Sequence, residues 1–282
     1  FATGVMIYFI SDDAPKGNYH EMKKNGTMPQ VSATACFQSG VFNFNTWLLF
    51  MQYGCCFGVE LTMNNAAALY FKEEFNQTTE SAAAIASIFG WMNLFARGLG
   101  GLCSDRSNAK WGMRGRLITQ LVLLILEGAT VLVFANTKSL GASIVVMVVF
   151  SIFVQAAEGS TYGIVPYIEP PATGSIAGIV GAGGSTFAVG FGIAFRQMEY
   201  DDAFIIMAGA IFASSLLTPF ICIRNHSSLF FGVDRNGEDD AAFDAGRWTL
   251  HLPFKNIRAK RKEGSDEEDV PVQSVEDNLP SQ

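Results

Sequence analysis

Apolar residues in this chain gather into six long runs that are separated by short polar stretches. Each run approaches the roughly 20 residues that an α-helix needs to cross the hydrocarbon layer of a membrane. A helix of a soluble protein would show a charged face at 3.6-residue spacing, whereas these runs are apolar nearly all round. We therefore predict six membrane-spanning helices, near residues 46–71, 82–102, 116–135, 140–163, 175–195 and 203–223.

The predicted spans determine the fold class. An open sheet would leave unpaired backbone groups in lipid, so continuous α-helix is the only architecture that these lengths allow. We expect an all-α membrane protein with a six-helix transmembrane bundle over residues 44–224. Residues 1–10 are apolar but too short to span, and we interpret them as the end of an earlier helix in a truncated chain. Residues 11–43 are expected to form a cytoplasmic connector, and residues 225–282 a cytoplasmic tail.

The distribution of Lys and Arg predicts the orientation of the bundle, because cytoplasmic loops are enriched in these residues. The loop expected after the second helix is strongly basic, whereas residues 72–80, before that helix, are mainly acidic. The basic loop is therefore expected in the cytoplasm, together with the connector and the tail. Few apolar residues follow Pro253, so the tail is predicted to be largely disordered, with a basic cluster that can lie on anionic lipid.

Composition excludes several classes of function. The net charge of −7 and the lack of a basic stripe interleaved with aromatic residues argue against nucleic acid as a partner. The five cysteines show no CxxC pair or His-rich spacing, so neither a metal site nor a disulfide is expected. The sequence offers no nucleophile–base pair or phosphate-binding loop, and we expect neither an enzyme nor a cofactor.

Four ionisable residues lie inside the predicted spans: Glu60, Arg97, Glu127 and Glu158. Such residues are costly in a membrane, and each needs a partner, a water-filled cavity or a function. At helical spacing, Glu60, Arg97 and Glu158 each belong to a line of small and polar residues that should face the bundle interior. Glu127 has no such line, which favours a structural or lipid-interface role.

Arg97 has two interpretations that the sequence does not separate. Its planar guanidinium donates parallel hydrogen bonds and stays protonated, which suits a small anion. An ion pair with Glu60 or Glu158 explains an interior arginine equally well. In either case Arg97 is expected inside the bundle.

The fifth predicted helix has a face with no side chain larger than serine. Such faces let helices approach closely, and exposed backbone can also approach a ligand. The run Gly181-Ala182-Gly183-Gly184 goes beyond a packing stripe, because it puts glycine on the opposite side of the helix as well and weakens it. The run therefore favours a bend or a substrate path.

Several strings resemble known transporter motifs. The charged segment after the second helix resembles the cytoplasmic signature of the major facilitator superfamily, with matches at Gly101, Asp105, Arg106, Arg114 and Arg116. In that superfamily the acidic and basic residues hold one conformer closed. Four longer strings resemble the high-affinity nitrate/nitrite porter family: GVELTMNNAAALYF (58–71), NLFARGLGG (93–101), QAAEGSTYGIVPYI (155–168) and GSIAGIVGAGGSTFAVGFG (174–192). They cover nearly the whole predicted bundle, so the chain is similar to helices seven to twelve of that family.

The resemblance implies roles for individual residues. Arg97 matches the arginine that binds nitrate, and Tyr53 matches the aromatic position near it. The second nitrate signature of the family matches the glycine run. There Ser185 stands where the family commonly has Asn, so one hydroxyl replaces an amide. The matching glycines are Gly181, Gly183 and Gly184.

The resemblance also implies an activity, which is proton-coupled uptake of nitrate, with nitrite as a further substrate, by alternating access between two six-helix halves. Glu158 and then Glu60 are the candidates for a coupled carboxylate, while a structural partnership with Arg97 explains them as well. The implied partners are protons, membrane lipid, the N-terminal half of the same chain and an accessory membrane protein, and the implied location is the plasma membrane. Two alternatives stay open: a transporter of another small anion and a non-transporting nitrate sensor.

Overall fold

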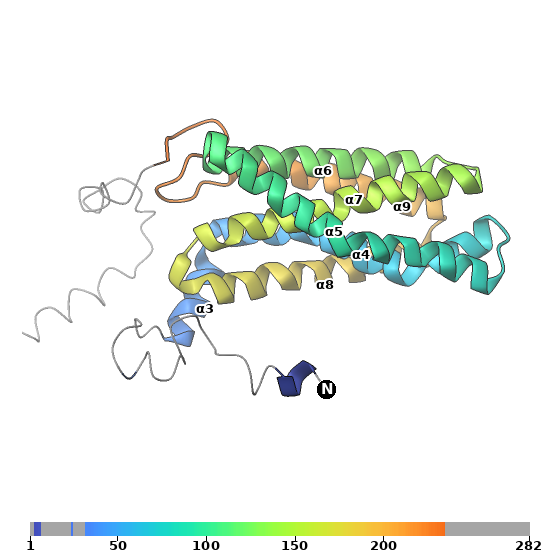
Figure 1. Cartoon of the computed structure of the whole chain (residues 1–282), viewed down its shortest axis with the longest axis horizontal. Coiled ribbons are helices and arrows are strands. Elements are labelled where there is room, and N and C mark those ends of the chain that lie inside the picture. The colour runs from blue at the N-terminus through green and yellow to red at the C-terminus, as the bar shows by residue number, and fades with distance from the viewer. Residues whose placement is uncertain (1–2, 7–23, 25–31, 235–282) are drawn as a thin grey trace, which may run out of the picture. The chain divides into compact units, whose positions relative to one another are not determined.

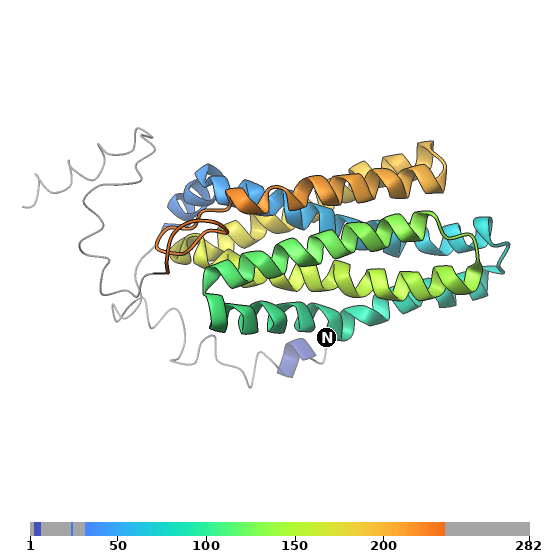
Figure 2. The same ribbon diagram turned by 90° about the horizontal axis from the view of Figure 1, so that it is seen from above.

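The computed structural model describes residues 3–6, 24 and 32–234, and all regular elements in residues 32–234 are helices. Six long helices run alongside one another (Figures 1 and 2). They are α4 (Phe44–Glu74), α5 (Thr79–Trp111), α6 (Met113–Ala135), α7 (Leu140–Ile164), α8 (Thr173–Gln197) and α9 (Tyr200–Ser215). A shorter helix, α3 (Ala33–Phe42), precedes them, and three 3-10 turns complete the set: η1 (Val165–Tyr167), η2 (Pro170–Ala172) and η3 (Thr218–Phe220).

The helices confirm the all-α prediction for the described part of the chain. Five of them, α5 to α9, are long and apolar enough to cross a membrane. The helix α4 has 31 residues but is not among these five, because polar residues interrupt its apolar run. Its polar side chains Gln52, Glu60 and Thr62 are buried against neighbouring helices. These three polar residues therefore face the protein interior, whereas Lys72, Glu73 and Glu74 at the end of α4 are exposed.

The basic loop expected after the second helix is not a loop. The helix α5 continues through Arg106 and Lys110 to Trp111, and Gly112 alone separates it from α6. Gly112 has a φ of +60°, a conformation that glycine adopts without steric cost. Charged residues are compatible with a helix that extends into water beyond the membrane. Their presence therefore marked the end of the apolar run and not the end of the helix.

Residues 33–42, which were expected to belong to the cytoplasmic connector, form α3. This helix packs against α8, where a Cβ placed on Gly40 would lie 3.2 Å from the Ile179 side chain. The Cys36 thiol donates a hydrogen bond to the Pro171 carbonyl oxygen in η2, just before α8. The rest of the predicted connector and residues 1–10 fall mainly outside the described residues.

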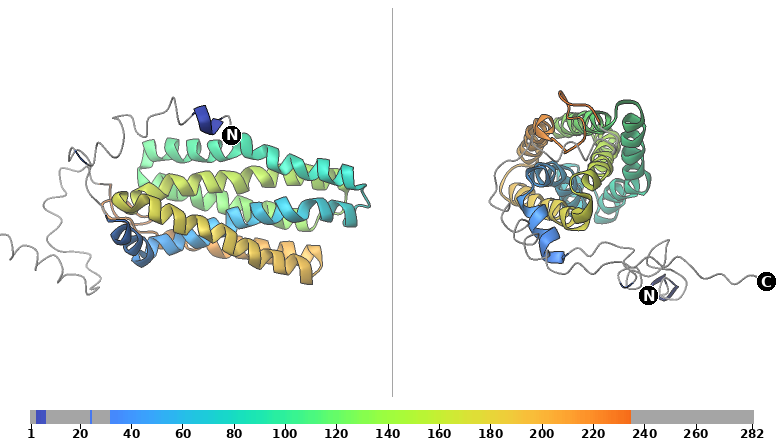
Figure 3. Two further views of the ribbon diagram at one scale, coloured as in Figure 1. Left: turned by 90° about the horizontal axis from the view of Figure 1, so that it is seen from below. Right: turned by 90° about the vertical axis from the view of Figure 1, so that its left-hand side faces the viewer.

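Close packing of α5 against α7 helps to hold the bundle together. Helices in lipid gain little from the hydrophobic effect, so small residues that permit close approach matter more than they do in water. A Cβ on Gly100 of α5 would lie 2.0 Å from the Ala156 carbonyl oxygen of α7, and one on Gly159 would lie 2.0 Å from the Arg97 carbonyl oxygen. Both positions therefore admit only hydrogen as a side chain. The end-on view shows the long helices side by side in one bundle (Figure 3).

Polar contacts distinguish the two ends of the bundle. At one end, the Lys138 ammonium pairs with Asp201, and the Tyr200 hydroxyl donates to Glu73 at 2.6 Å. At the other end, Asn45 at the start of α4 donates to the Cys222 carbonyl oxygen at 2.8 Å. The junction of α5 and α6 lies at this second end. The helix ends therefore alternate as the predicted topology requires.

Candidate functional site

Arg97 lies between two carboxylates that come from different helices. Its Nη2 atom on α5 is 3.1 Å from Oε2 of Glu60 on α4, and the same nitrogen pairs with Oε2 of Glu158 on α7. The Glu60 carboxylate also accepts a hydrogen bond from the Asn93 amide at 2.8 Å. Three of the polar lines recognised in the sequence therefore meet at one point. The tight contact of α5 with α7 at Gly159, next to Glu158, brings these two helices close enough for the pair.

The arginine and its partners differ in burial. The Arg97 side chain is 38% exposed, whereas the side chains of Glu60 and Glu158 are 8% and 0% exposed. The guanidinium therefore faces the open side of the bundle and the carboxylates lie behind it. Nε of Arg97 and Oε1 of Glu158 have no hydrogen-bond partner among the described residues. Both polar groups thus retain unused bonding capacity.

One aromatic ring faces the guanidinium, and further rings pack against that ring. Arg97 Cζ lies 5.7 Å from the ring centroid of Phe57, a distance at which the cation is attracted to the ring face. The Phe57 ring packs against Tyr53 with centroids 5.3 Å apart, and Tyr53 meets Tyr162 edge-on at 5.1 Å. Tyr53 is buried, as a side chain that shapes a site requires. Low polarity around a charge strengthens its interaction with any counter-ion.

The glycine run of α8 reaches this aromatic group. A Cβ on Gly184 would lie 2.2 Å from Phe57, and a Cβ on Gly181 would lie 3.3 Å from the Tyr162 hydroxyl. A Cβ on Gly183 would lie 2.4 Å from the Phe50 carbonyl oxygen. The run thus lets α8 approach α4 behind the rings that contact Arg97. Ser185 is exposed on α8 and makes no hydrogen bond or ion pair with these residues in the part of the chain that the structure describes.

The opposite face of α8 is open. Cβ atoms on Gly174, Gly178, Gly190 and Gly192 would each have no described neighbour within 4 Å. The small-residue face therefore has open space at Gly174, Gly178 and Gly192, but it approaches α4 at Ala188, whose backbone nitrogen would lie 3.1 Å from a Cβ on Gly58. The tightest glycine contacts of α8 come from Gly183 and Gly184, which the sequence placed on the other side of the helix.

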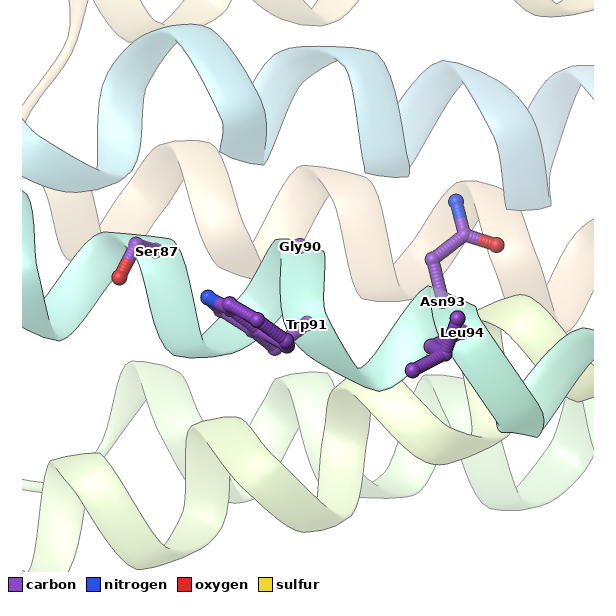
Figure 4. Close-up of a pocket in the computed structure, with 5 residues that line it drawn as sticks. All are labelled: Ser87, Gly90, Trp91, Asn93 and Leu94. Atoms are coloured by element: carbon purple, nitrogen blue, oxygen red, sulfur yellow. The ribbon is translucent and has the colours of Figure 1, made fainter.

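A surface hollow on α5 borders the site. It is lined by Ser87, Gly90, Trp91, Asn93 and Leu94, which are drawn in Figure 4. Asn93 extends toward α4, consistent with its hydrogen bond to Glu60, whereas Ser87 points the other way. Gly90 leaves space within the hollow, since a Cβ there would meet nothing within 4 Å. Asn93 thus connects the open side of α5 to the interior carboxylate.

Glu127 on α6 is fully buried, which excludes the lipid-interface role that the sequence left open. Neither of its carboxyl oxygens has a hydrogen-bond partner among the described residues, and its nearest polar neighbour is the Cys56 thiol. That thiol already donates to the Gln52 carbonyl oxygen at 3.2 Å. The described residues also contain no group of three His, Cys, Asp or Glu side chains that could hold a metal ion.

The charged motif at the end of α5 separates into two parts. Arg116 pairs with Asp105 at 2.7 Å and its Nη1 donates to Ser104 at 3.2 Å. Arg114 points instead to residues that follow α9. Arg106 and Asp105 are exposed, and Gly101 has open space where a Cβ would stand. The expected acid–base pair therefore exists, but one of the predicted arginines serves a different contact.

Sequence reasoning missed Phe57 and Gly159. Phe57 follows Tyr53 by four residues and precedes Glu60 by three, so helical spacing could have placed it on the same face. Gly159 follows Glu158 directly and was passed over because a lone glycine in a helix has many explanations. Its role is visible only when the Arg97 backbone is seen against it.

Comparison with known proteins identifies relatives along most of the chain. It is 39% identical over 254 residues to "High affinity nitrate transporter 2.5" of Arabidopsis thaliana, which covers 89% of this chain and 51% of the relative. It is 39% identical over 258 residues to "Nitrate transporter 2.1" of Chlamydomonas reinhardtii, covering 88% and 47%. A third relative, "Nitrate/nitrite transporter NrtP" of Picosynechococcus, is 37% identical over 148 residues, covering 51% and 26%.

The chain spans about half the length of the curated plant and algal relatives that it matches. No family model matches the sequence. The similarity therefore concerns a region of each relative, and within this chain that region includes most of the described helices.

Proposed function

Since this chain belongs to the high-affinity nitrate transporter family of the major facilitator superfamily, we propose that it forms the C-terminal half of a protein that carries nitrate across a membrane. In this proposal α4 to α9 are helices seven to twelve, and α4 crosses the membrane like the other five. The observation that carries the proposal is the position of Arg97. It is an exposed cation on the open side of a buried acidic pair, inside a helix that is apolar enough to span lipid.

Arg97 has donors to offer to a planar anion. A guanidinium carries five N–H groups in a fixed plane, of which two belong to Nη2. Both ion pairs of Arg97 use Nη2, and Nη1 donates no hydrogen bond among the described residues, whereas Nε is buried. Nitrate is planar and accepts parallel hydrogen bonds in the way that a carboxylate does. We propose that it binds there, with Phe57 and Tyr53 forming the apolar wall.

Charge balance supports coupling to protons. Two ionised carboxylates beside one guanidinium leave a net charge of −1, and nitrate would add a second negative charge at the same place. Like charges this close in a poorly hydrated interior repel strongly. A proton on Glu158, or on Glu60 as the second candidate, would remove this repulsion. Uptake of nitrate together with protons follows from that requirement.

The proposed transport cycle is alternating access, in which two six-helix halves rock about a site between them. The open faces of α5 and α8 would then meet the N-terminal half, and the Asp105–Arg116 pair would stabilise the conformer closed at the cytoplasmic end. We also propose that the protein lies in the lipid of the plasma membrane and works with an accessory membrane protein. A transporter of another small anion, nitrite included, is the alternative to nitrate, because a guanidinium binds several small oxyanions.

The test replaces Arg97 by lysine in the whole transporter. A lysine keeps the charge but not the planar donors, so nitrate uptake should fall by more than about tenfold, the effect of losing hydrogen bonds to a charged group. Surface labelling should report normal insertion in the membrane. Arg196→Lys, in the last turn of α8, is the matched control. Unchanged half-saturation for nitrate in Arg97→Lys would refute the binding role, and competition by nitrite in the same assay measures the alternative substrate.

A further inference from the structure

The chain after α9 packs on the end of the bundle that holds the α5–α6 junction. Residues 225–234 were predicted to belong to a solvated tail, yet Ser227, Ser228 and Leu229 are buried. Leu229 joins a hydrophobic cluster with Met113 and Leu117 of α6. Residues 235–282, with the predicted basic cluster, lie outside the described residues. We refer to residues 226–234 as the clasp.

Asp234 anchors the clasp to the beginning of α6. Its Oδ2 accepts a hydrogen bond from the Met113 backbone N–H at 3.1 Å and from the Ser227 hydroxyl at 3.0 Å. Its Oδ1 accepts from the Ser227 backbone N–H at 2.8 Å. An acidic side chain at a helix N-terminus satisfies a free N–H and interacts favourably with the helix dipole. The clasp thus supplies the cap that α6 lacks within its own sequence.

The protonation of Asp234 follows from the same contacts. Partial burial would raise its pKa, but the hydrogen bonds from Ser227, Met113 and His226 outweigh burial and hold the pKa below its usual value. A depressed pKa means that the carboxylate is ionised at neutral pH. Its contribution to stability is present above the pKa of the unfolded chain and is lost as pH falls through the lower folded value. The clasp is therefore closed at cytoplasmic pH.

Gly112 makes room for the carboxylate. A Cβ at this position would lie 1.6 Å from Oδ2 of Asp234, and the φ of +60° disfavours other residues in any case. The residue between α5 and α6 is thus shaped both for the turn and for the arrival of Asp234. A segment resting loosely on the surface would not require this fit.

The clasp also engages two of the three arginines of the charged motif, Arg114 directly and Arg116 through the Tyr167 ring. Arg114 donates from its backbone N–H to the Ser227 hydroxyl at 3.0 Å, and from its side chain to the carbonyl oxygens of Ser228 and Gly232 at 3.3 and 3.1 Å. Arg116 lies over the Tyr167 ring at 5.2 Å, and that ring meets His226 edge-on at 5.2 Å. The clasp therefore touches the turn after α5 and the turn after α7.

We propose that Asp234 is a positioning residue for the Asp105–Arg116 pair, because its clasp fixes the α5–α6 junction to the end of α9. Removing the clasp leaves the first turn of α6 uncapped, and Arg116 in that turn then no longer holds a fixed place opposite Asp105. The rate of movement between conformers then falls, while the Arg97 site in the middle of α5 is unchanged. The proposal uses the proposed transport function only as one of its two readouts.

The experiment compares Asp234→Asn with Asp202→Asn, an exposed acidic residue in the first turn of α9 at the other end of the bundle. Each is made in the whole transporter carrying Leu229→Cys. Asp234→Asn should raise the rate of maleimide labelling at position 229 by about tenfold, as expected for lost hydrogen bonds to a charged group, and should lower the maximal rate of nitrate uptake at unchanged half-saturation. Asp202→Asn should change neither quantity.

Equal labelling in the two variants, or a maximal rate that Asp234→Asn leaves intact, would overturn the proposal. If Asp234→Asn does not reach the membrane, hydrogen exchange of the unmodified transporter decides: slow exchange of the Met113, Arg114 and Ser227 amides supports the clasp, and exchange at the rate of an open loop overturns it. Labelling does not depend on the substrate. A transporter that fails the Arg97→Lys test but shows the labelling difference would lose the proposed function and keep the clasp.

Discussion

The two arginine–carboxylate groups of this molecule have opposite patterns of burial. In the middle of the bundle, the Arg97 side chain is 38% exposed and its carboxylate partners are buried. At the end of the bundle, the Arg116 side chain is 7% exposed and its partner Asp105 is 65% exposed. The first arrangement presents a cation to an incoming anion. The second hides the cation behind a ring and presents only an acid to solvent, which suits a structural contact.

The two arginines also differ in which side of the guanidinium is left open. Arg116 is enclosed by Asp105, the Ser104 hydroxyl and the Tyr167 ring. Its Nε, like that of Arg97, is buried and has no hydrogen-bond partner among the described residues. Arg97 directs both ion pairs through Nη2, and its Nη1 donates no hydrogen bond among the described residues. The middle group is therefore the one that we propose as the ligand site.

The largest expected effect comes from removing a charge behind Arg97. Glu158→Gln keeps the shape of the side chain but removes the proton-binding carboxylate, so proton-driven nitrate uptake should fall by about a hundredfold, a loss on the scale of a broken buried pair. Exchange of nitrate across the membrane, which needs no net proton movement, should persist. Uptake is measured at several pH values, and exchange with labelled nitrate.

Glu127→Gln is the matched control, because Glu127 is buried on α6 but forms no ion pair among the described residues. This variant should keep its pH dependence of uptake. If Glu127→Gln loses the pH dependence of uptake and Glu158→Gln keeps it, the coupled proton binds to α6 and not to α7.

A smaller effect is expected where the site is shaped by packing. The methyl group added in Gly184→Ala would lie 2.2 Å from the present position of the Phe57 ring, so the ring has to move. Overpacking of this kind costs about 1–3 kcal/mol, and the displaced ring should raise the half-saturation for nitrate by about five- to tenfold. Gly190→Ala on the open side of α8 should leave both insertion and affinity unchanged. Equal affinity in the two variants would show that Phe57 does not depend on the glycine run.

The smallest effect is expected at the end of the bundle. Asp105 is largely exposed, and exposed ion pairs contribute about 0–1 kcal/mol. Asp105→Asn should therefore lower the maximal uptake rate by less than about fivefold and leave the half-saturation for nitrate unchanged. Arg106→Gln, an exposed change one residue away, serves as the control. A raised half-saturation in Asp105→Asn would remove the distinction between the two groups.

Much of the middle group could be predicted from the sequence, because helical spacing alone puts Glu60, Arg97 and Glu158 on interior lines. What the sequence left open was whether the arginine binds an anion or pairs with acids. The structure gives the pairing, and it also leaves Arg97 exposed with an unused nitrogen. Anion binding and pairing with carboxylates are thus compatible. The spacing of residues along the sequence cannot show that one arginine is able to do both.

The end of the bundle was harder to predict, for a physical reason. Charged residues of α5 were assigned to a loop, although a helix extends readily into water with such residues. The clasp joins Asp234 to Met113, which are 121 residues apart in sequence. No local period marks such a contact, and the segment was assigned to the tail because it follows the last apolar run, although it contains Leu229, Phe230 and Phe231. Sequence patterns report which face is buried, and not which distant segment covers it.

The contact of Gly100 with Ala156 lies near Arg97 and far from the Thr79 end of α5. The helix has 33 residues, and Thr79 is 21 residues from Gly100, which corresponds to about 32 Å at the α-helical rise. Arg97 is three residues from the same point, or about 4.5 Å. A tilt of about 10° around the contact would move the Thr79 end by about 5 Å and Arg97 by less than about 1 Å. Because the contact lies beside Arg97, the Thr79 end of α5 can move while Arg97 stays nearly in place.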